Sequence, residues 1–432
     1  MNLKNLLWCV LIPILGSAGS KRPNILFILA DDVGQEVLGC YGGTSYKTPN
    51  LDKLASGGIR FDHAYSMPVC HPTRLSLMTG KYPFRIGSGW GKFPKDEEAS
   101  TFSSLLQKNG YATAVAGKWQ MTLLKNDTQH PARCGFEQWS LFGWHEGARY
   151  YDPYIWENGV LRNDLKSRYG PGHYTDFLIK FMEQSRKAKK PFLAYYSMAL
   201  AHDVTDDLKQ PVPYMPGKDR WQDYREMAEA MDIMVGKLIS ALDKMKLRER
   251  TLILFSGDNG TASRSIIRHD GKRYIREPVF SMLGEKRIAG GKGSLTDRGT
   301  RVPLIANWPS VIKSGNTSNQ LIDCSDFLPT FCELTNTSLP KNIKLDGHSF
   351  ACAVSGGKGT SKRSWVYAER GGKYFVRNQN WKLYNEGTLH DLRKENSEKN
   401  GIRANAKHSS DAKAARELLD AAQIELGRGS RY

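Results

Sequence analysis

The sequence has few cysteines, and it has no long apolar run outside its first twenty residues. Seven cysteines in 432 residues are too few for a disulfide-dense scaffold, and no paired Cys-x-x-Cys motifs indicate a zinc site. No later stretch is apolar enough to cross a bilayer, so we expect no stable membrane insertion. No internal repeat is visible. With these classes excluded, the sequence indicates a large globular protein.

The N-terminal segment is typical of a cleaved signal peptide. Lys4 precedes an apolar stretch over residues 6–15, which is too short to span a membrane, and small residues follow. We therefore predict a signal peptide over residues 1–20 and an exported protein, periplasmic or extracellular. Cys9 would leave with this segment. If one of the other six cysteines has special chemistry, five remain, so at least one should be a buried free thiol.

The charge balance is strongly basic. Lys and Arg number 62 against 44 Asp and Glu, which gives a formal net charge of +18. A basic surface attracts any polyanion, including nucleic acids and sulfated polysaccharides. Export argues against nucleic acid as a partner. A basic surface that only aids solubility is the alternative, and it stays open.

Apolar strands and amphipathic helices alternate along the chain. This pattern predicts an α/β fold with a large, mixed, mostly parallel sheet flanked by helices. We expect strands at 24–30, 59–65, 112–116, 192–198, 251–255 and 302–308, and helices at 49–57, 72–79, 101–109, 174–187 and 221–245.

The last hundred residues have a different pattern. Short strands near 366–384 and a helix at 411–426 predict a small C-terminal subdomain of antiparallel sheet plus helix. We place the large α/β domain at residues 21–345 and this α+β subdomain at residues 346–432.

Polar side chains lie just beyond the ends of four predicted strands: Asp31 and Asp32, Lys118, His202, and Asp258 and Asn259. In open α/β sheets this edge binds ligands. Carboxylate and amide oxygens suit calcium or magnesium rather than zinc. Either acidic pair alone would be explained by a turn or a helix cap. Together on one edge, the two pairs predict a site for a divalent metal.

Cys70 precedes a predicted helix, whose free backbone N–H groups favour an anion or an activated nucleophile. Arg74 follows one helical turn later and could reach back to it. Two alternatives stay open from the residues alone. Cys70 could be a small buried hydrophobe, and Arg74 a solvated helix residue.

These motifs together resemble the type I, formylglycine-dependent sulfatases, which are arylsulfatase-like members of the alkaline phosphatase superfamily. Cys70 to Arg74 (CHPTR) matches the C-x-P-x-R signature of that family. Further similar blocks occur in the family's order, at 24–32, 49–52, 117–119, 257–260 and 291–303. Each block is weak to moderate alone, but their number and order make the resemblance specific from about residue 22 to residue 400.

The resemblance implies an enzyme that hydrolyses sulfate monoesters. It implies that a maturation enzyme oxidises Cys70 to formylglycine, whose hydrated form is the nucleophile. The implied calcium ligands are Asp31, Asp32, Asp258 and Asn259. The other implied roles are Arg74 steadying the formylglycine, Lys118 and Lys292 contacting sulfate oxygens, and His202 acting as general acid.

Gln120 departs from the family pattern. The family commonly has a histidine two residues after the lysine of Gly-Lys-Trp, and this chain has a glutamine there. Glutamine cannot accept a proton at neutral pH, although it can hold a hydrogen bond. The usual base for expelling sulfate is therefore in question.

Two segments bear on the substrate. Residues 136–156 are rich in aromatic side chains, which stack on sugar rings, and residues 264–287 are rich in Lys and Arg. Loop packing and a solvated basic loop are the respective alternatives. We hypothesise a sulfated carbohydrate as substrate. Two rival functions stay open: a related phosphodiester or phosphonate hydrolase, and a glycan-binding protein with a decayed site.

Overall fold

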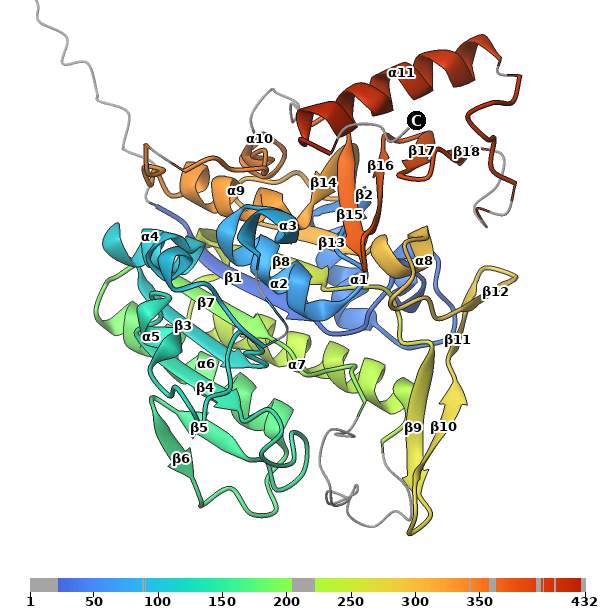
Figure 1. Cartoon of the computed structure of the whole chain (residues 1–432). Coiled ribbons are helices and arrows are strands. Elements are labelled where there is room, and N and C mark those ends of the chain that lie inside the picture. Colours follow the sequence, from blue (N-terminus) through green and yellow to red (C-terminus); the bar gives the residue numbers. More distant parts are fainter. Residues whose placement is uncertain are drawn as a thin grey trace, which may run out of the picture.

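The computed structural model describes residues 22–87, 89, 91–203, 222–341, 343–356, 363–393, 398, 400–407 and 409–428. The expected signal peptide, residues 1–20 with Cys9, lies outside these ranges. A ten-stranded sheet runs through the molecule with helices on both faces, and a smaller sheet with one long helix lies beside it (Figure 1). The predicted fold class is confirmed.

Five neighbouring strands of the large sheet are parallel. In order across the sheet they are β8 (Thr251–Gly257), β1 (Asn24–Ala30), β7 (Phe192–Ser197), β3 (Ala112–Gly117) and β4 (Gln138–Phe142). The flanking strands are β14 (Asn316–Asp323), β2 (Ile59–Tyr65) and β13 (Leu304–Asn307) beyond β8, and β5 (Ile155–Glu157) and β6 (Val160–Arg162) beyond β4. Because β13, β5 and β6 pair antiparallel with their neighbours, the sheet is mixed.

Strand β1 separates two hydrophobic cores. Alternate side chains of a strand point to opposite faces, so Leu26 and Ile28 enter one core, whereas Ile25 and Phe27 enter the other. The first core is covered by α1 (Pro49–Ser56), α6 (Gly170–Lys187) and α7 (Tyr224–Lys244). The second core is covered by α2 (Cys70–Thr79), α4 (Phe102–Lys108) and α9 (Phe327–Leu334). Burial of β1 on both faces explains its unbroken apolar sequence.

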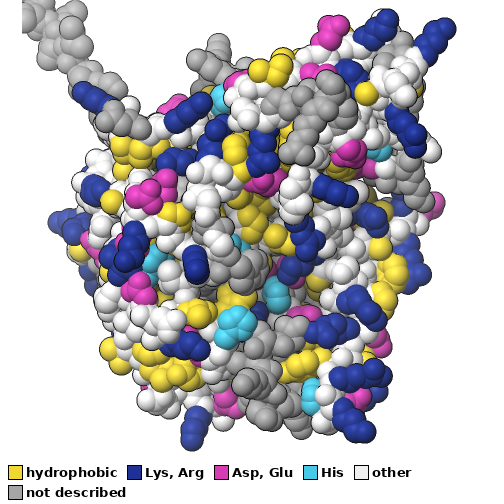
Figure 2. Space-filling view, in the orientation of Figure 1, with side chains coloured by type: hydrophobic (Ala, Val, Ile, Leu, Met, Phe, Trp, Pro, Cys, Tyr) yellow, Lys and Arg dark blue, Asp and Glu magenta, His cyan; other side chains and the backbone are white. Residues whose placement is uncertain are grey.

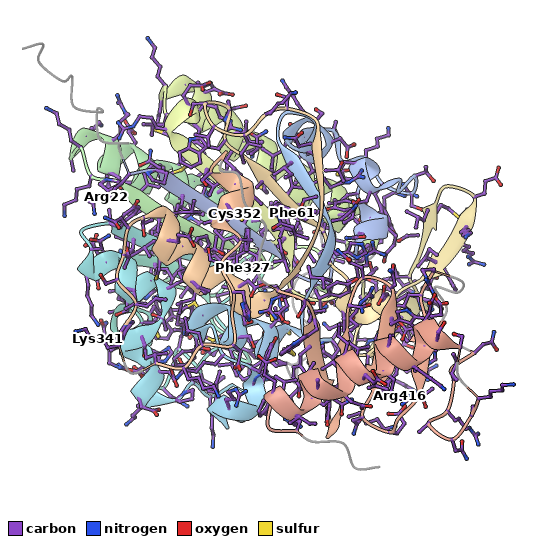
Figure 3. The ribbon with its side chains drawn as sticks, turned by 90° about the horizontal axis from the view of Figure 1, so that it is seen from above. Arg22, Phe61, Phe327, Lys341, Cys352 and Arg416 are labelled. Atoms are coloured by element: carbon purple, nitrogen blue, oxygen red, sulfur yellow. The ribbon has the colours of Figure 1, made fainter. Side chains whose placement is uncertain are left out.

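Aromatic rings join the sheet to α9. Phe350 packs edge-on against Phe61 of β2 and Phe327 of α9, with ring centroids 5.9 and 5.6 Å apart. Figure 3 views the molecule from above and labels Phe61 and Phe327 near the middle of the view. Phe61, Phe327 and Phe350 are all buried, so this contact is part of the apolar core.

The C-terminal part forms a four-stranded antiparallel sheet beside α11 (Ser410–Glu425). Its strands are β15 (Val366–Arg370), β16 (Lys373–Arg377), β17 (Trp381–Tyr384) and β18 (Leu389–Asp391). An ion pair joins this sheet to the main body, with the buried Arg377 placing its Nη1 at 2.7 Å from Asp297 Oδ1. The boundary at residues 345 and 346 stays a prediction.

The basic segment forms two hairpins, β9 (Arg264–His269) with β10 (Tyr274–Pro278) and β11 (Phe280–Leu283) with β12 (Lys286–Ala289). A solvated basic loop was one of the two interpretations that the sequence left open for it. The hairpins project from one side of the molecule (Figure 1), and Lys and Arg side chains gather over that side in Figure 2. Exposed cations on them are Arg264, Arg268, Lys272, Arg273, Lys286 and Arg287.

The six cysteines within the described residues are all free, and Cys134, Cys324 and Cys332 are buried as well as Cys70. The prediction of at least one buried free thiol is confirmed. Among the described residues, none of the helices combines the length and apolar character needed to span a bilayer.

Candidate active site

The order of the strands brings the predicted site residues to one edge of the sheet. Asp31 follows β1, Lys118 follows β3, and Asp258 follows β8, while the chain beyond β7 leads to His202. Because β8, β1, β7 and β3 are neighbours, their carboxyl ends adjoin. The structure thus places together Asp31 and Asp258, which are 227 positions apart in sequence.

The turn after β3 requires glycine. Gly117 has φ +101°, and a Cβ at this position would lie 2.0 Å from the carbonyl oxygen of Ser197. This close approach lets the backbone N–H of Lys118 donate to the same carbonyl at 2.6 Å. The backbone contact therefore fixes the position of Lys118 independently of its side-chain contacts.

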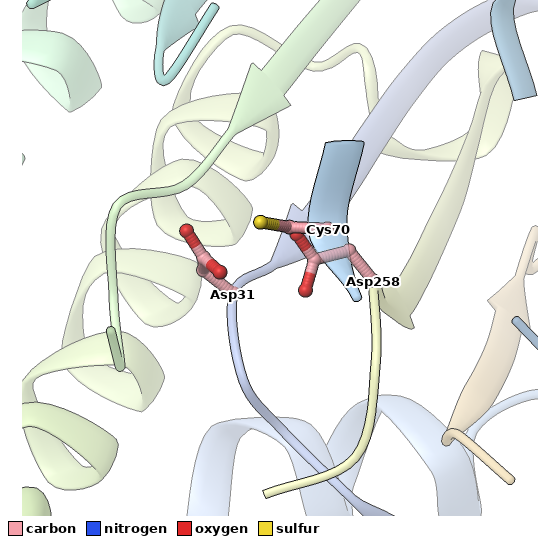
Figure 4. Close-up of side chains that lie close together, drawn as sticks. All are labelled: Asp31, Cys70 and Asp258. Carbon is pink, nitrogen blue, oxygen red and sulfur yellow. The ribbon is translucent and has the colours of Figure 1, made fainter. Parts of the chain in front are cut away.

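Asp31, Cys70 and Asp258 face one another. A carboxylate oxygen of each aspartate and the Cys70 sulfur all lie within 4.8 Å of one another, and the three residues are buried. Figure 4 shows the three side chains converging from the end of β1, the start of α2 and the end of β8. Cys70 is the first residue of α2 rather than the residue before it, so it lies at the N-terminal turn of that helix.

Arg74 holds one side of this cluster. Its Nε and Nη2 donate to Asp258 Oδ2 at 3.0 and 2.7 Å, and its Nη1 donates to the hydroxyl of Ser197. Arg74 is 1% exposed, so the alternative of a solvated helix residue is wrong. One helical turn separates Arg74 from Cys70, which explains how the same helix presents both groups to the cluster.

Lysine ammonium groups hold the two N-terminal aspartates. Lys118 Nζ donates to Asp31 Oδ2 at 2.5 Å, and Lys292 Nζ lies 2.7 Å from Asp32 Oδ1. Asn259 Nδ2 also donates to Asp32 Oδ1, at 2.7 Å. Asp32 has φ +60°, an uncommon backbone conformation for aspartate that recurs at functional sites.

The residues present fit a hard divalent cation. Asp31 Oδ1 and Asn259 Oδ1 are buried without a hydrogen-bond partner among the described residues, a costly state that a metal ligand would resolve. Three carboxylates (Asp31, Asp32, Asp258) and three side-chain cations (Arg74, Lys118, Lys292) meet here. With all six groups ionised their formal charges sum to zero, so the cluster is not too positive to accept a cation.

Burial and charge set the protonation of the cluster. Burial, together with the neighbouring Asp31 carboxylate, raises the pKa of Asp258 to about 7, although Arg74 opposes this. Burial alone would raise the pKa of Asp31, but Lys118, His202 and Arg74 bring it below its usual range. Burial also raises the pKa of the Cys70 thiol. An unmodified Cys70 is therefore protonated at neutral pH and is a weak nucleophile.

His202 lies at the open side of the cluster. Its Nε2 is 4.0 Å from Asp32 Oδ2, and Arg149 Nη1 is 3.3 Å from its Nδ1. Burial, aided by the positive charge of Lys292, lowers the pKa of His202 well below its usual value. The side chain of His202 is 21% exposed, whereas Asp31 is fully buried.

Two residues of the site were missed from the sequence. Ser197 ends β7, so its place at a strand end was a usable signal. Its hydroxyl donates to the carbonyl of Lys118 at 2.5 Å and accepts from Arg74. Arg149 lies within the aromatic segment and carries no sequence signal of its own.

The chain matches known sulfatases over most of its length. The sequence profile of the Sulfatase family matches residues 23–337, and the profile named N-sulphoglucosamine sulphohydrolase, C-terminal, matches residues 291–425. The chain is 28% identical to N-acetylgalactosamine-6-sulfatase of Canis lupus familiaris, over 82% of this chain and 70% of that protein. It is 26% identical to N-acetylglucosamine-6-O-sulfatase of Bacteroides thetaiotaomicron, over 94% and 87% respectively.

A solved structure agrees with these matches. The crystal structure of Ps i-CgsB superposes with a TM-score of 0.73, at 26% identity, covering 94% of this chain and 92% of that chain. The same protein has been solved in complex with k-i-k-neocarrahexaose. The family profile covers more than half of the chain, and the site lies within it. The chain belongs to the sulfatase family and is a sulfuric ester hydrolase.

Proposed function

We propose that this sulfatase removes sulfate from a sulfated carbohydrate, using calcium and a formylglycine formed from Cys70. The observation that carries the proposal is the convergence of Cys70 with Asp31 and Asp258, their oxygen and sulfur atoms within 4.8 Å of one another. A protonated, buried thiol is a weak nucleophile. Formylglycine made from Cys70 would, once hydrated, present a hydroxyl nucleophile beside a metal.

The calcium ligands in this proposal are Asp31, Asp32, Asp258 and Asn259. When bound, the ion would supply positive charge to a sulfate oxygen and to the nucleophile. The unpartnered oxygens of Asp31 and Asn259 support this assignment, as does the all-oxygen donor set.

The remaining charged residues have separate tasks. Lys118 and Lys292 pair with Asp31 and Asp32 in this structure. With substrate bound they would hold sulfate oxygens, where their charge stabilises the transition state. Arg74 positions Asp258 and the first turn of α2. His202 would donate a proton from Nε2 to the departing oxygen. An anionic substrate beside His202 would raise its pKa and so favour the protonated form that this step needs.

Three further observations support a carbohydrate substrate. The two relatives named above are, by name, sulfatases of amino sugars, and Ps i-CgsB has been solved with an oligosaccharide. The basic hairpins β9–β12 add positive charge at the side of the molecule, which suits a polyanionic chain. We further propose that the protein is exported and that a dedicated maturation enzyme, which supplies the oxidant, converts Cys70.

Sulfate release tests the proposal. The protein is produced with a maturation enzyme and assayed with calcium against sulfated sugars, an aryl sulfate, a phosphodiester and a phosphonate. We expect calcium-dependent sulfate release that is fastest from a sulfated sugar and absent in Cys70→Ala. Faster cleavage of the phosphodiester or phosphonate would contradict the proposal, as would sulfated-sugar binding without release by matured protein. Equal rates on the aryl sulfate and the best sugar would contradict the substrate assignment alone.

A further inference from the structure

A hollow in the protein surface lies beside the charged cluster of the candidate active site. It has a volume of about 480 Å³, within the range of small-ligand sites, and it is lined by Lys92, Phe93, Gln120, Leu123, Trp144 and His145, among others. The lining includes the aromatic rings of Phe93 and Trp144 and the primary amides of Gln120 and Asn126. We call this hollow the Gln120 pocket.

The Gln120 pocket adjoins the catalytic groups. Gln120 is two residues beyond Lys118, and Lys118 Nζ lies 5.6 Å from the centroid of the Trp144 ring. On another side, the side chain of His71, the residue after Cys70, hydrogen-bonds the backbone of Lys92. A group attached to a sulfate at Lys118 would therefore reach the pocket directly.

Gln120 carries an unused hydrogen-bonding capacity. The residue is 2% exposed, and both its amide oxygen and its amide nitrogen lack a partner among the described residues. Its backbone has φ +58°, which is uncommon for glutamine. Leaving a buried amide without partners costs about 1–3 kcal/mol, so a structural role for it is unsatisfactory. A ligand in the pocket would satisfy both atoms.

The chemistry of the pocket suits a sugar ring. An amide donates through nitrogen and accepts through oxygen, so it matches a hydroxyl, which also does both. The aromatic side chains Phe93 and Trp144 offer apolar faces for the C–H side of a ring. We propose that the Gln120 pocket is a sugar-binding subsite and that the Gln120 amide is its specificity-determining contact. The proposal rests on the carbohydrate function above, and it gives Gln120 a role in recognition rather than proton transfer.

Ligand binding tests this without requiring turnover. The parent protein is Cys70→Ala with calcium, and calorimetry measures Kd for inorganic sulfate, N-acetylglucosamine 6-sulfate, N-acetylgalactosamine 6-sulfate and a sulfated neocarrabiose. The readout is the ratio of the sulfate Kd to the Kd of the tightest sugar. In Gln120→Ala we expect this ratio to fall by about five- to tenfold, as for one lost hydrogen-bonding group. Gln184→Ala, at an exposed glutamine on α6, is the matched control and should keep the parent ratio.

Gln120→Asn is the second variant, because asparagine tolerates the left-handed backbone and keeps the amide on a side chain that is one methylene shorter. It should also lower the ratio. The proposal is overturned if no sugar binds the parent more tightly than sulfate, or if both folded Gln120 variants keep the parent ratio. Hydrolysis that fails while the ratio falls would count against the proposed function only. Hydrolysis that succeeds with an unchanged ratio would count against the pocket only.

Discussion

At the scale of single residues, Arg74 shows how burial separates a candidate site residue from a surface one. Its guanidinium is 1% exposed and makes two contacts to Asp258 and one to Ser197. The sequence predicted that Arg74 could turn back towards Cys70. It could not identify these partners, because Asp258 is 184 positions away.

Removing Arg74 should destabilise the fold as well as the site. Arg74→Ala leaves the Asp258 carboxylate buried without its cation, which typically costs about 3–5 kcal/mol in the free energy of unfolding. Urea unfolding followed by circular dichroism measures this cost. Arg393→Ala is the control, because Arg393 is 44% exposed, so solvent screens its pair with Asp391 and the loss should be much smaller. Similar losses in the two variants would show that the buried pair is not special.

Replacing His202 should matter most for poor leaving groups. A general acid assists a sugar oxygen, which leaves with difficulty, more than an aryl oxygen, which leaves easily. In matured protein, His202→Ala should therefore lower kcat on the best sulfated sugar by about 10²–10⁴ and on an aryl sulfate by much less. His173→Ala is the control. His173 lies on α6, where it contacts Glu157 of β5, and it lines a different pocket. Equal losses on both substrates would contradict the role of general acid.

At the scale of elements, local patterns predicted the central strands well and the edges poorly. Strands β1 and β2 occupy the residue ranges that their apolar patterns indicated. The parallel strand β4, the sheet edges β14, β5 and β6, and the hairpins β9–β12 were not predicted as strands. The edges and hairpins are polar and half-exposed, so they lack a strong alternation. Helix α6 begins at Gly170, before its predicted start at 174, since its first turn is rich in glycine and proline.

The approach of β3 to β7 at Gly117 can be tested with one methyl group. Gly117→Ala places a Cβ 2.0 Å from the Ser197 carbonyl oxygen and imposes a left-handed backbone on alanine. Gly271→Ala imposes a similar backbone, with φ +92°, but its Cβ would meet nothing within 4 Å. We expect a loss of about 1 kcal/mol at Gly271. At Gly117 the loss should be clearly larger, with reduced sulfate release because Lys118 is displaced. Equal unfolding midpoints would show that the approach is not tight.

At the scale of the whole molecule, the active site joins distant parts of the chain. Lys292 lies on the segment before α8 (Asp297–Thr300), and the C-terminal sheet touches that segment, with Arg370 donating to the carbonyl of Gly293. Sequence motifs predicted the site residues through a family resemblance. The residues alone could not predict that β8, β1, β7 and β3 would be neighbours, because strand order depends on pairing between remote segments.

Acid should destabilise the protein through its buried histidines. Burial lowers the pKa of His130 to about 4, although Glu98 opposes this. In the unfolded chain the pKa is near 6.5, so the unfolded state binds more protons between these values. The stability present above pH 6.5 should fall by about 2–4 kcal/mol as pH decreases towards 4. His130→Gln should reduce this slope in unfolding measurements across the range. An unaltered slope would show that His130 does not contribute.

The mass of the peptide that contains Cys70 tests the central claim most directly. The protein is made with a competent maturation enzyme, beside a control sulfatase whose conversion is verified in the same cells. We predict that mass spectrometry finds an aldehyde in place of the Cys70 thiol, trapped as a hydrazone by a hydrazine reagent. A Cys70 that stays a thiol while the control is converted would contradict the proposed chemistry of this site.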